Sequence, residues 1–367
     1  MKQASKGNGP VLFIQDGSEL LYNSQHYIKD LGPTSDGSGN GLMMHTCLAV
    51  RFESGQSDVL GLASQSAWVR EEDKSKRTRN ESHVWLDTLK AIGSPPKGTE
   101  WITVGDRGSD IYDFMHGARE LGWDFVIRAK YNRHIEVDGK KERLFDWLRQ
   151  ITASASMPLY LRARNAKEFS GAVELEVSYG SAVLPPPSSA NMGPFAPLYF
   201  VRVNCPTRDK LEWFIITSVP LESAQDALRV VEIYRRRWLI EDYHKALKSG
   251  CKMEESQLKY ADRILALLGF LGVIATQLLA LRQWARLEPH VPAHERVNQQ
   301  MLDIVCAYFR LKSPTLREYW VCVARLGGFL ARKSDGDPGW QTIWDGYNRL
   351  QDMVLGVEIF TELMRCG

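Results

Sequence analysis

The sequence predicts an α/β fold with a mixed sheet, a β-rich insertion and a helical C-terminal region. Over the first 130 residues, short apolar runs typical of strands alternate with helical patterns. Residues from about 131 to 220 are dominated by strand patterns, and the chain beyond them is dominated by helical ones. The order of the elements therefore predicts a core, an insertion and a helical region.

The first 130 residues supply the strands and helices of the predicted core. The run VLFIQD is short, almost entirely apolar and followed by glycine, as in a central strand that is covered on both faces. In order, we expect strands over 11–16, 41–52 and 58–69, a helix that ends before Gly93, a strand that ends at Asp106, a helix to about Gly122, and a strand over 123–130.

The middle of the chain changes character. In GAVELEVSYG, apolar and polar residues alternate, which predicts a half-buried antiparallel strand. The proline-rich stretch VLPPPSSANMGPFAP is expected to be irregular, and two more strands are expected over 198–204 and 211–219.

Helices are expected after residue 220. Ser223 and Asp226 form a capping-box pattern for a helix that we expect to run to Gly250. Residues 264–281 are apolar enough for either a buried core helix or a membrane span, and the soluble character of the rest of the chain favours the core helix. More helices are expected around Gly327 and Gly328.

The composition is that of a soluble globular protein. Apolar residues make up 44% and charged residues 25% of the 367 residues, which argues against wholesale disorder. The net charge of +2 does not by itself indicate nucleic-acid binding, so such a role needs local clusters of Lys and Arg. The scattered cysteines form no CxxC pair and indicate free thiols in a reducing cytosol. Pro292 lies between His290 and His294 and argues against a zinc site there.

One charged segment, YRRRWLIEDYHKALKSG (residues 234–250), combines cations, acids and aromatic residues. A continuous helix at about 100° per residue would place five of its side chains on one face. They are Tyr234, Arg237, Trp238, Glu241 and Lys248. An ordinary solvated helix explains the charges but not the two aromatic residues beside them.

Two further acids make a functional interpretation stronger. Asp16 and Asp106 each end a predicted central strand, where open α/β sheets bind their ligands. Either acid alone would be an ordinary turn or cap residue. Together with Glu241 they would supply three oxygen ligands, which suits a pair of Mg²⁺ ions about 4 Å apart that act on a phosphodiester.

At these residues the sequence resembles a known family. FIQDGSELLY, VGDRGSDIYDF and the charged segment are similar to the three catalytic blocks of the DDE transposases of bacterial insertion sequences. The closest likeness is to the insertion-sequence-four family in its Tn-five branch, whose YREK signature, Y-x2-R-x3-E-x6-K, is matched at Tyr234, Arg237, Glu241 and Lys248. ESHVW, LEWFIITSVPLES and ARLGGF also resemble the family, so the likeness extends from about residue 11 to 360.

The resemblance implies an RNase-H-like core and a division of the chain. Residues 1–130 would form the first part of that core, 131–220 the β-rich insertion, 221–287 the core helices that carry the third acid, and 288–367 a C-terminal helical dimerisation region.

The resemblance also implies roles for single residues. Asp16, Asp106 and Glu241 would bind two Mg²⁺ ions, for which Mn²⁺ can substitute. Tyr234, Arg237 and Lys248 would hold phosphates near the cleaved end, and Trp213 would stack on a flipped base in a pocket lined by Trp238 and Arg128. Lys130 would also contact DNA, and three basic segments, at 74–79, 128–134 and 162–167, would follow the DNA backbone.

The implied function is Mg²⁺-dependent cut-and-paste transposition in the bacterial cytoplasm, associated with the nucleoid and not with a membrane. The implied partners are double-stranded transposon ends, target DNA and a second copy of the chain. Two departures from the family pattern are visible: the end-binding N-terminal domain is absent before the first block, and Gly17 and Ser18 follow Asp16 where D-T-T or D-S-S is common. The first departure leaves open an alternative, a non-catalytic regulator that inhibits full-length transposase by dimerising with it. A related RNase-H-like nuclease is a third possibility.

Overall fold

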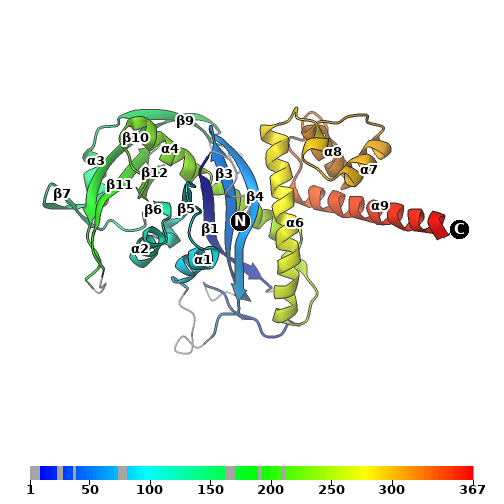
Figure 1. Cartoon of the computed structure of the whole chain (residues 1–367), viewed down its shortest axis with the longest axis horizontal. Helices are drawn as coiled ribbons and strands as arrows, with labels where there is room; N and C mark the ends of the chain where they lie inside the picture. The colour runs from blue at the N-terminus through cyan, green and yellow to red at the C-terminus, as the bar shows by residue number, and fades with distance from the viewer. Residues whose placement is uncertain are drawn as a thin grey trace. The chain divides into compact units, whose positions relative to one another are not determined.

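The computed structural model describes residues 9–22, 28–35, 39–72, 81–161, 170–188, 192–208 and 211–366 (Figure 1). The chain divides into two compact units. The first unit comprises Met1–Asp16, His45–Gly55 and Thr78–Leu239, and the second comprises Gly17–Met44, Gln56–Arg77 and Ile240–Gly367. This division cuts through three elements: β1 (Val11–Leu21), β3 (Asn40–Glu53) and α5 (Trp238–Lys245). The sequence-based boundaries at residues 130, 220 and 287 follow chain order and stay a prediction.

The first unit contains a mixed sheet, which confirms the predicted α/β fold class. β1 (Val11–Leu21), β5 (Trp101–Gly105) and β6 (Asp124–Arg128) are parallel neighbours. β12 (Glu212–Thr217) pairs with β6 in the antiparallel sense, and β11 (Phe195–Asn204) and β10 (Gly171–Leu184) continue the sheet. The remaining strands of this unit are β7 (His134–Val137), β8 (Lys140–Arg143) and β9 (Ala155–Leu161), with β3 (Asn40–Glu53) beside β1.

The parallel strands are buried because their residues are apolar on both faces. Residues 11–14 and all of β5 are buried, as the continuous run VLFI predicts. Three aromatic rings pack at the centre: the ring centroid of Phe13 lies 4.7 Å from that of Trp101 and 4.5 Å from that of Trp123. Beside them, the buried Gln15 amide donates to Thr103 Oγ1 (3.0 Å) and its Oε1 lies 2.9 Å from His45 Nε2. This core fixes the strand ends that carry the site.

Helices cover the sheet of the first unit. α1 (Val84–Ile92) packs against α2 (Tyr112–Glu120), and α2 lies beside β6. α4 (Ala224–Arg235) packs on β5, β6, β10 and β11. α3 (Leu144–Gln150) is a short helix that the sequence patterns did not predict. The proline-rich connection is shorter than expected, because β10 extends to Leu184 and β11 begins at Phe195.

The helix expected from Ser223 to Gly250 is interrupted, so this prediction is wrong in its continuity. The capping box at Ser223 and Asp226 is confirmed. However, the backbone N–H groups of Arg236 and Arg237 bond back only three residues, to Ile233 and Tyr234, which tightens the turn and ends α4. The helix resumes as α5 (Trp238–Lys245) and closes with a π-helical turn, Ala246–Gly250.

In the second unit, the apolar helix α6 (Ala261–Leu287) is three residues longer at its start and six at its end than the predicted core helix. By length and composition it could cross a membrane, with a mean hydropathy of 2.4 over its best 18-residue window, and half of that window is buried inside the protein. α6 packs on β4 (Gln56–Trp68) and on α8 (Leu316–Leu326), and Trp284 Nε1 donates to Asp58 Oδ1 at 2.9 Å. These contacts are those of a core helix.

The C-terminal helices of the second unit are α7 (Gln299–Phe309), α8 (Leu316–Leu326) and α9 (Trp340–Cys366). α8 and α9 cross where glycines allow their backbones to meet. A Cβ atom on Gly327, the residue that caps α8, would overlap the carbonyl oxygen of Thr342, and one on Gly346 would overlap that of Val323. The packing of these helices therefore depends on two glycines that the sequence places nineteen residues apart.

Candidate active site

Two of the predicted acids lie at one edge of the parallel strands in the first unit. Ile14 of β1 lies beside Val104 of β5, so the same register continued by two residues brings Asp16 level with Asp106. Both side chains are only partly buried. The expectation that the strand ends at Asp16 is wrong, because β1 continues to Leu21. The carboxylates nevertheless follow the carboxyl end of the β1–β5 pairing, where α/β sheets place ligands.

The turn after β5 fixes Asp106. Its Oδ1 accepts a hydrogen bond from the backbone N–H of Gly108 at 2.7 Å and caps a short 3₁₀ turn, Arg107–Ser109. Ser109 Oγ donates to the carbonyl oxygen of Asp106 at 2.7 Å. Asp106 therefore caps the turn that follows its strand, as an Asp in this position often does. The capping hydrogen bond holds its carboxylate in one orientation.

Arg237 brings positive charge to this edge. Its Nη1 lies 3.6 Å from Asp16 Oδ2, and the two side chains are 14% and 17% exposed. The break between α4 and α5 places Arg237 at the corner where the chain turns. A phosphate that approached Asp16 would meet this guanidinium as well.

An aromatic and cationic group adjoins the two acids. Tyr234, on the last turn of α4, is buried, and its ring centroid lies 5.9 Å from that of Trp213 on β12 at an interplanar angle of 60°. Burial raises the pKa of Tyr234, while the charges of Arg237 and Arg128 and a hydrogen bond from Arg128 act in the opposite direction. Arg128, on β6, also donates to the carbonyl oxygen of Glu212 at 3.4 Å. Residues that the sequence predicted for the site thus come together from α4, β6, β12 and the corner that follows α4.

The charged segment does not form the continuous helix from which one shared face was predicted, because α4 ends at Arg235 and the helix resumes at Trp238. Tyr234 is buried, whereas Trp238 is 48% exposed. The guanidinium carbon of Arg237 lies 5.9 Å from the centroid of the Trp238 ring. The corner at Arg236 and Arg237 changes the rotation along the segment, and the common face of the five side chains stays a prediction.

Glu241 and Lys248 belong to the second unit. Glu241 is partly buried on α5, and the residues that follow it anchor the helix: Asp242 Oδ1 lies 2.9 Å from Arg282 Nη1, and the Tyr243 hydroxyl accepts from Gln65 Nε2 at 2.7 Å. Lys248 lies in the π-helical turn, with its Nζ 3.8 Å from Glu254 Oε1. Such turns are frequent at functional sites.

The remaining predicted DNA contacts have mixed outcomes. Lys130 is exposed beside Tyr131, with its Nζ 5.2 Å from the ring centroid. The basic segments at 74–79 and 162–167 lie outside the described residues. Sequence reasoning missed Asp110, whose buried carboxylate pairs with Arg133; the only signal was its position as the second acid of DRGSD.

The donor chemistry of Asp16 and Asp106 suits a divalent cation such as Mg²⁺, because carboxylate oxygens are its preferred protein ligands. Among the described residues, no group of three or more His, Cys, Asp or Glu side chains is placed to hold a metal ion. Glu241 is assigned to the other unit, so a site formed by all three acids stays a prediction.

Comparison with known proteins places these residues in a wider context. Residues 12–278 match the family model described as Transposase DDE domain, and residues 303–363 match the Transposase Tn5 dimerisation domain. Among solved structures, the chain is similar to a piggyBac transposase studied by cryo-EM in a synaptic complex with hairpin DNA. The identity is 8% and the TM-score 0.40, over 95% of this chain and 57% of the other. The chain thus spans somewhat more than half the length of that protein.

Proposed function

Since the chain belongs to the transposase DDE-domain family, we propose that it is a metal-dependent DNA transposase. The observation that carries the proposal is the meeting of Asp16, Asp106, Arg237 and Tyr234 at one edge of the parallel strands. Carboxylates that suit a cation, beside guanidinium groups that suit phosphate, are what phosphodiester chemistry requires.

We assign the metal ligands to Asp16, Asp106 and Glu241. The assignment rests on the carboxylate chemistry of these residues, on their partial exposure and on the family match. Two Mg²⁺ or Mn²⁺ ions bound there would lower the pKa of the attacking water and neutralise charge on the phosphate. The protein's own part is to hold the carboxylates ready, as the Gly108 N–H does for Asp106.

The cations and rings around the acids would bind the DNA end. Arg237, Arg128 and Lys248 carry fixed positive charge for phosphate oxygens. The Tyr234 hydroxyl, held beside Arg128, would contact phosphate as a neutral donor. Trp213 offers a partly exposed π surface for a flipped base, and the exposed Trp238 a second one.

The reaction that we propose has four chemical stages. Water attacks the phosphodiester at the transposon end and frees a 3′-OH, which then attacks the opposite strand and closes a hairpin. A second water opens the hairpin, and the 3′-OH joins target DNA by displacing a 3′-oxygen there. Each stage exchanges one P–O bond for another, so no covalent protein intermediate is needed.

The function is tested with a labelled duplex that ends in the transposon sequence, with Mg²⁺ and with EDTA. We expect nicking, hairpin and strand-transfer products with Mg²⁺ only. Cleavage that proceeds equally in EDTA would contradict metal dependence. A chain that cleaves nothing but suppresses a full-length transposase would favour the regulator.

For the base-stacking role of Trp213, we expect Trp213→Ala to lower hairpin formation about 10- to 100-fold, because stacking of one base contributes ~1–3 kcal/mol. Trp213→Phe keeps a π surface and is expected to retain most of the activity. Quantification of hairpins on a gel measures both variants. Equal losses in the two variants would show that the indole has a packing role instead.

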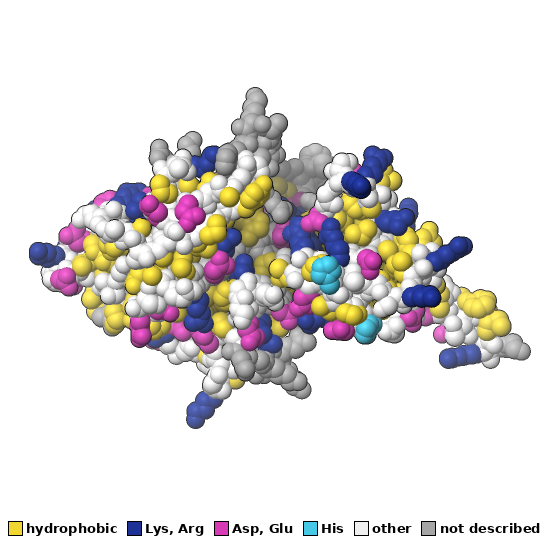
Figure 2. Space-filling view, turned by 90° about the horizontal axis from the view of Figure 1, so that it is seen from above, with side chains coloured by type: hydrophobic (Ala, Val, Ile, Leu, Met, Phe, Trp, Pro, Cys, Tyr) yellow, Lys and Arg dark blue, Asp and Glu magenta, His cyan; other side chains and the backbone are white. Residues whose placement is uncertain are grey.

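The C-terminal helix α9 of the second unit offers a surface for a second copy of the chain. Residues 355–365 of α9 are exposed on all sides of the helix, and their exposed apolar side chains gather towards its end (Figure 2). They are Leu355, Val357, Ile359, Phe360, Leu363 and Met364. A helix that is apolar without burial needs a partner. We infer a homodimer, consistent with the dimerisation-domain match over 303–363.

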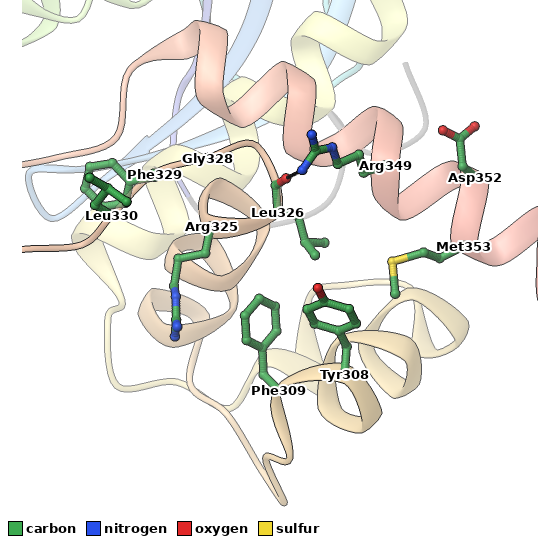
Figure 3. A pocket seen from close by; sticks show the side chains of 10 residues that line it. All are labelled: Tyr308, Phe309, Arg325, Leu326, Gly328, Phe329, Leu330, Arg349, Asp352 and Met353. Carbon is green, nitrogen blue, oxygen red and sulfur yellow. Dashed lines mark hydrogen bonds between the residues drawn. The ribbon is translucent and has the colours of Figure 1, made fainter.

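A hollow beside α9 supports this inference. Its volume is about 570 Å³, and its walls come from α7, α8, the segment that follows α8, and α9 (Figure 3). The guanidinium carbon of Arg325 lies 5.0 Å from the Phe309 ring centroid, and Arg349 Nη1 donates to the Leu326 carbonyl oxygen at 2.7 Å. Exposed Tyr308 and Leu330 at this hollow give a partner's apolar side chains something to pack on.

Phe360→Glu is expected to shift the protein from dimer to monomer at micromolar concentration, because a charge replaces an exposed ring in the apolar surface. Sedimentation velocity measures the change. The matched control, Gln257→Glu, adds the same charge at an exposed position of the same unit outside α9 and should leave the dimer intact. A Phe360→Glu protein that remains dimeric would show that this end of α9 is not the interface.

A further inference from the structure

A second hollow lies in the first unit. Its volume is about 440 Å³. It is lined by Asp110, Tyr112, Tyr131, Arg133, His134 and Pro185–Pro187. The loop that follows β6 forms one wall and the start of the proline-rich connection forms another. None of the residues assigned above to metal or base binding lines it.

One buried carboxylate organises this loop. The Asp110 side chain is fully buried and accepts hydrogen bonds from the backbone N–H groups of Lys130 (2.7 Å) and Tyr131 (3.3 Å). Arg133 donates to the same carboxylate and to the Asp110 carbonyl oxygen. Since a buried charge is tolerated only when it is paired and hydrogen-bonded, these contacts hold the loop in one conformation.

The loop presents an aromatic ring to solvent between two cations. Tyr131 is 53% exposed. The Lys130 ammonium lies 5.2 Å and the Arg133 guanidinium carbon 5.8 Å from the ring centroid. A single exposed tyrosine is ordinary on a protein surface. A rigidly held one, flanked by cations and facing a hollow, is the combination with which proteins bind single-stranded nucleic acid.

The other walls also suit a base rather than a polar solute. The Tyr112 hydroxyl donates a hydrogen bond to the Gly193 carbonyl oxygen at 2.6 Å, which fixes the ring that lines the hollow. The prolines add flat apolar surface. Exposed His134 lines the hollow and exposed Lys130 lies beside the Tyr131 ring, so both offer N–H donors for a phosphate.

We propose that this hollow binds one unpaired nucleotide of a DNA strand, with its base on Tyr131 and its phosphate near Lys130 and His134. The inference rests on the proposed function, since it supposes a protein that handles DNA. β6 connects the two places: Arg128 contributes to the candidate active site, and Tyr131 follows it by three residues. DNA that leaves the active site unpaired would meet this second binding place.

The experiment measures binding of fluorescent DNA in EDTA, where no cleavage occurs. Two probes share one duplex, and one of them carries an additional single-stranded tail of four nucleotides. We expect Tyr131→Ala to weaken binding of the tailed probe about 5- to 100-fold, as the loss of one stacked base implies, and to change binding of the blunt probe less than twofold. Tyr131→Phe keeps the ring and should bind the tailed probe within about twofold of the wild type.

The outcomes separate this inference from the proposed function. Wild-type affinity of Tyr131→Ala for the tailed probe would overturn the stacking role, as would an equal loss on both probes. A wild-type protein that binds neither probe would instead contradict the proposed function. Melting temperatures of the variants serve as the folding check, and an exposed ring predicts little change.

Discussion

Replacement of Glu241 with glutamine is expected to abolish DNA cleavage while the affinity for the DNA end stays within about threefold of the wild type. The amide keeps the size of the side chain but loses the charge that a divalent cation requires. We expect the cleavage rate to fall by at least about 10³-fold, because the electrostatic contribution of a bound metal is among the largest in such a reaction. Single-turnover cleavage and fluorescence anisotropy measure the two quantities.

Glu255→Gln is the matched control for this experiment. Glu255 is an exposed residue of the same unit, and its replacement with glutamine removes the same charge as Glu241→Gln. It should cleave at nearly the wild-type rate. Wild-type nicking by the Glu241→Gln protein would remove Glu241 from the assigned ligands, and a parallel loss in the control would point to the net charge of the segment instead.

Gly346→Ala is expected to produce a large loss of stability in the C-terminal helices. The added methyl group would overlap the Val323 carbonyl oxygen, which is backbone and cannot move aside without separating α8 from α9. We expect a destabilisation of ~2 kcal/mol or more, at the upper end of what overpacking costs. Denaturant unfolding followed by circular dichroism measures it, and a weaker dimer should accompany the loss.

Gly356→Ala provides a control with the opposite sign. A Cβ atom there meets nothing within 4 Å, and alanine is favoured over glycine in a helix by about 0.5–1 kcal/mol. This variant should therefore be slightly more stable than the wild type. A Gly346→Ala protein as stable as the Gly356→Ala protein would show that α8 and α9 do not pack as closely as described.

Features fixed by short stretches of sequence were predictable. The apolar run before Asp16 is a central strand, Asp106 closes another, and Ser223 and Asp226 cap a helix, because each depends on neighbours within a few residues. The soluble character of the rest of the chain favoured a core helix over a membrane span for residues 264–281, and the contacts of α6 with β4 and α8 agree with it.

Features fixed by distant residues were not predictable. Nothing in RVVEIYRRRWLIEDYHK breaks a helix by propensity. The corner instead accompanies contacts of Arg236, which donates to the Gly55 carbonyl oxygen and lies over the Phe52 ring. The continuation of β1 past Gly17 likewise depends on pairing such as that of the Tyr22 N–H with the Asn40 carbonyl oxygen.

The candidate site shows the same division. Spacing and family resemblance singled out Asp16, Asp106, Arg237 and Tyr234, and the first unit brings them to one strand edge. The hydrogen bonds from the Tyr131 loop to the Asp110 carboxylate join residues twenty or more positions apart, and no local sequence pattern indicates these bonds. The carboxylate that holds this loop is thus found only from tertiary contacts.

The most direct test of the central claim, that Asp16, Asp106 and Glu241 together hold the catalytic cations, is anomalous diffraction from crystals of the protein bound to a transposon-end duplex and Mn²⁺. We predict two anomalous peaks, each about 2.0–2.6 Å from carboxylate oxygens of these residues, the range for hard divalent cations. Asp106→Asn crystals should lose at least one peak. Peaks that lie elsewhere, or a Glu241 carboxylate that coordinates neither ion, would contradict the account.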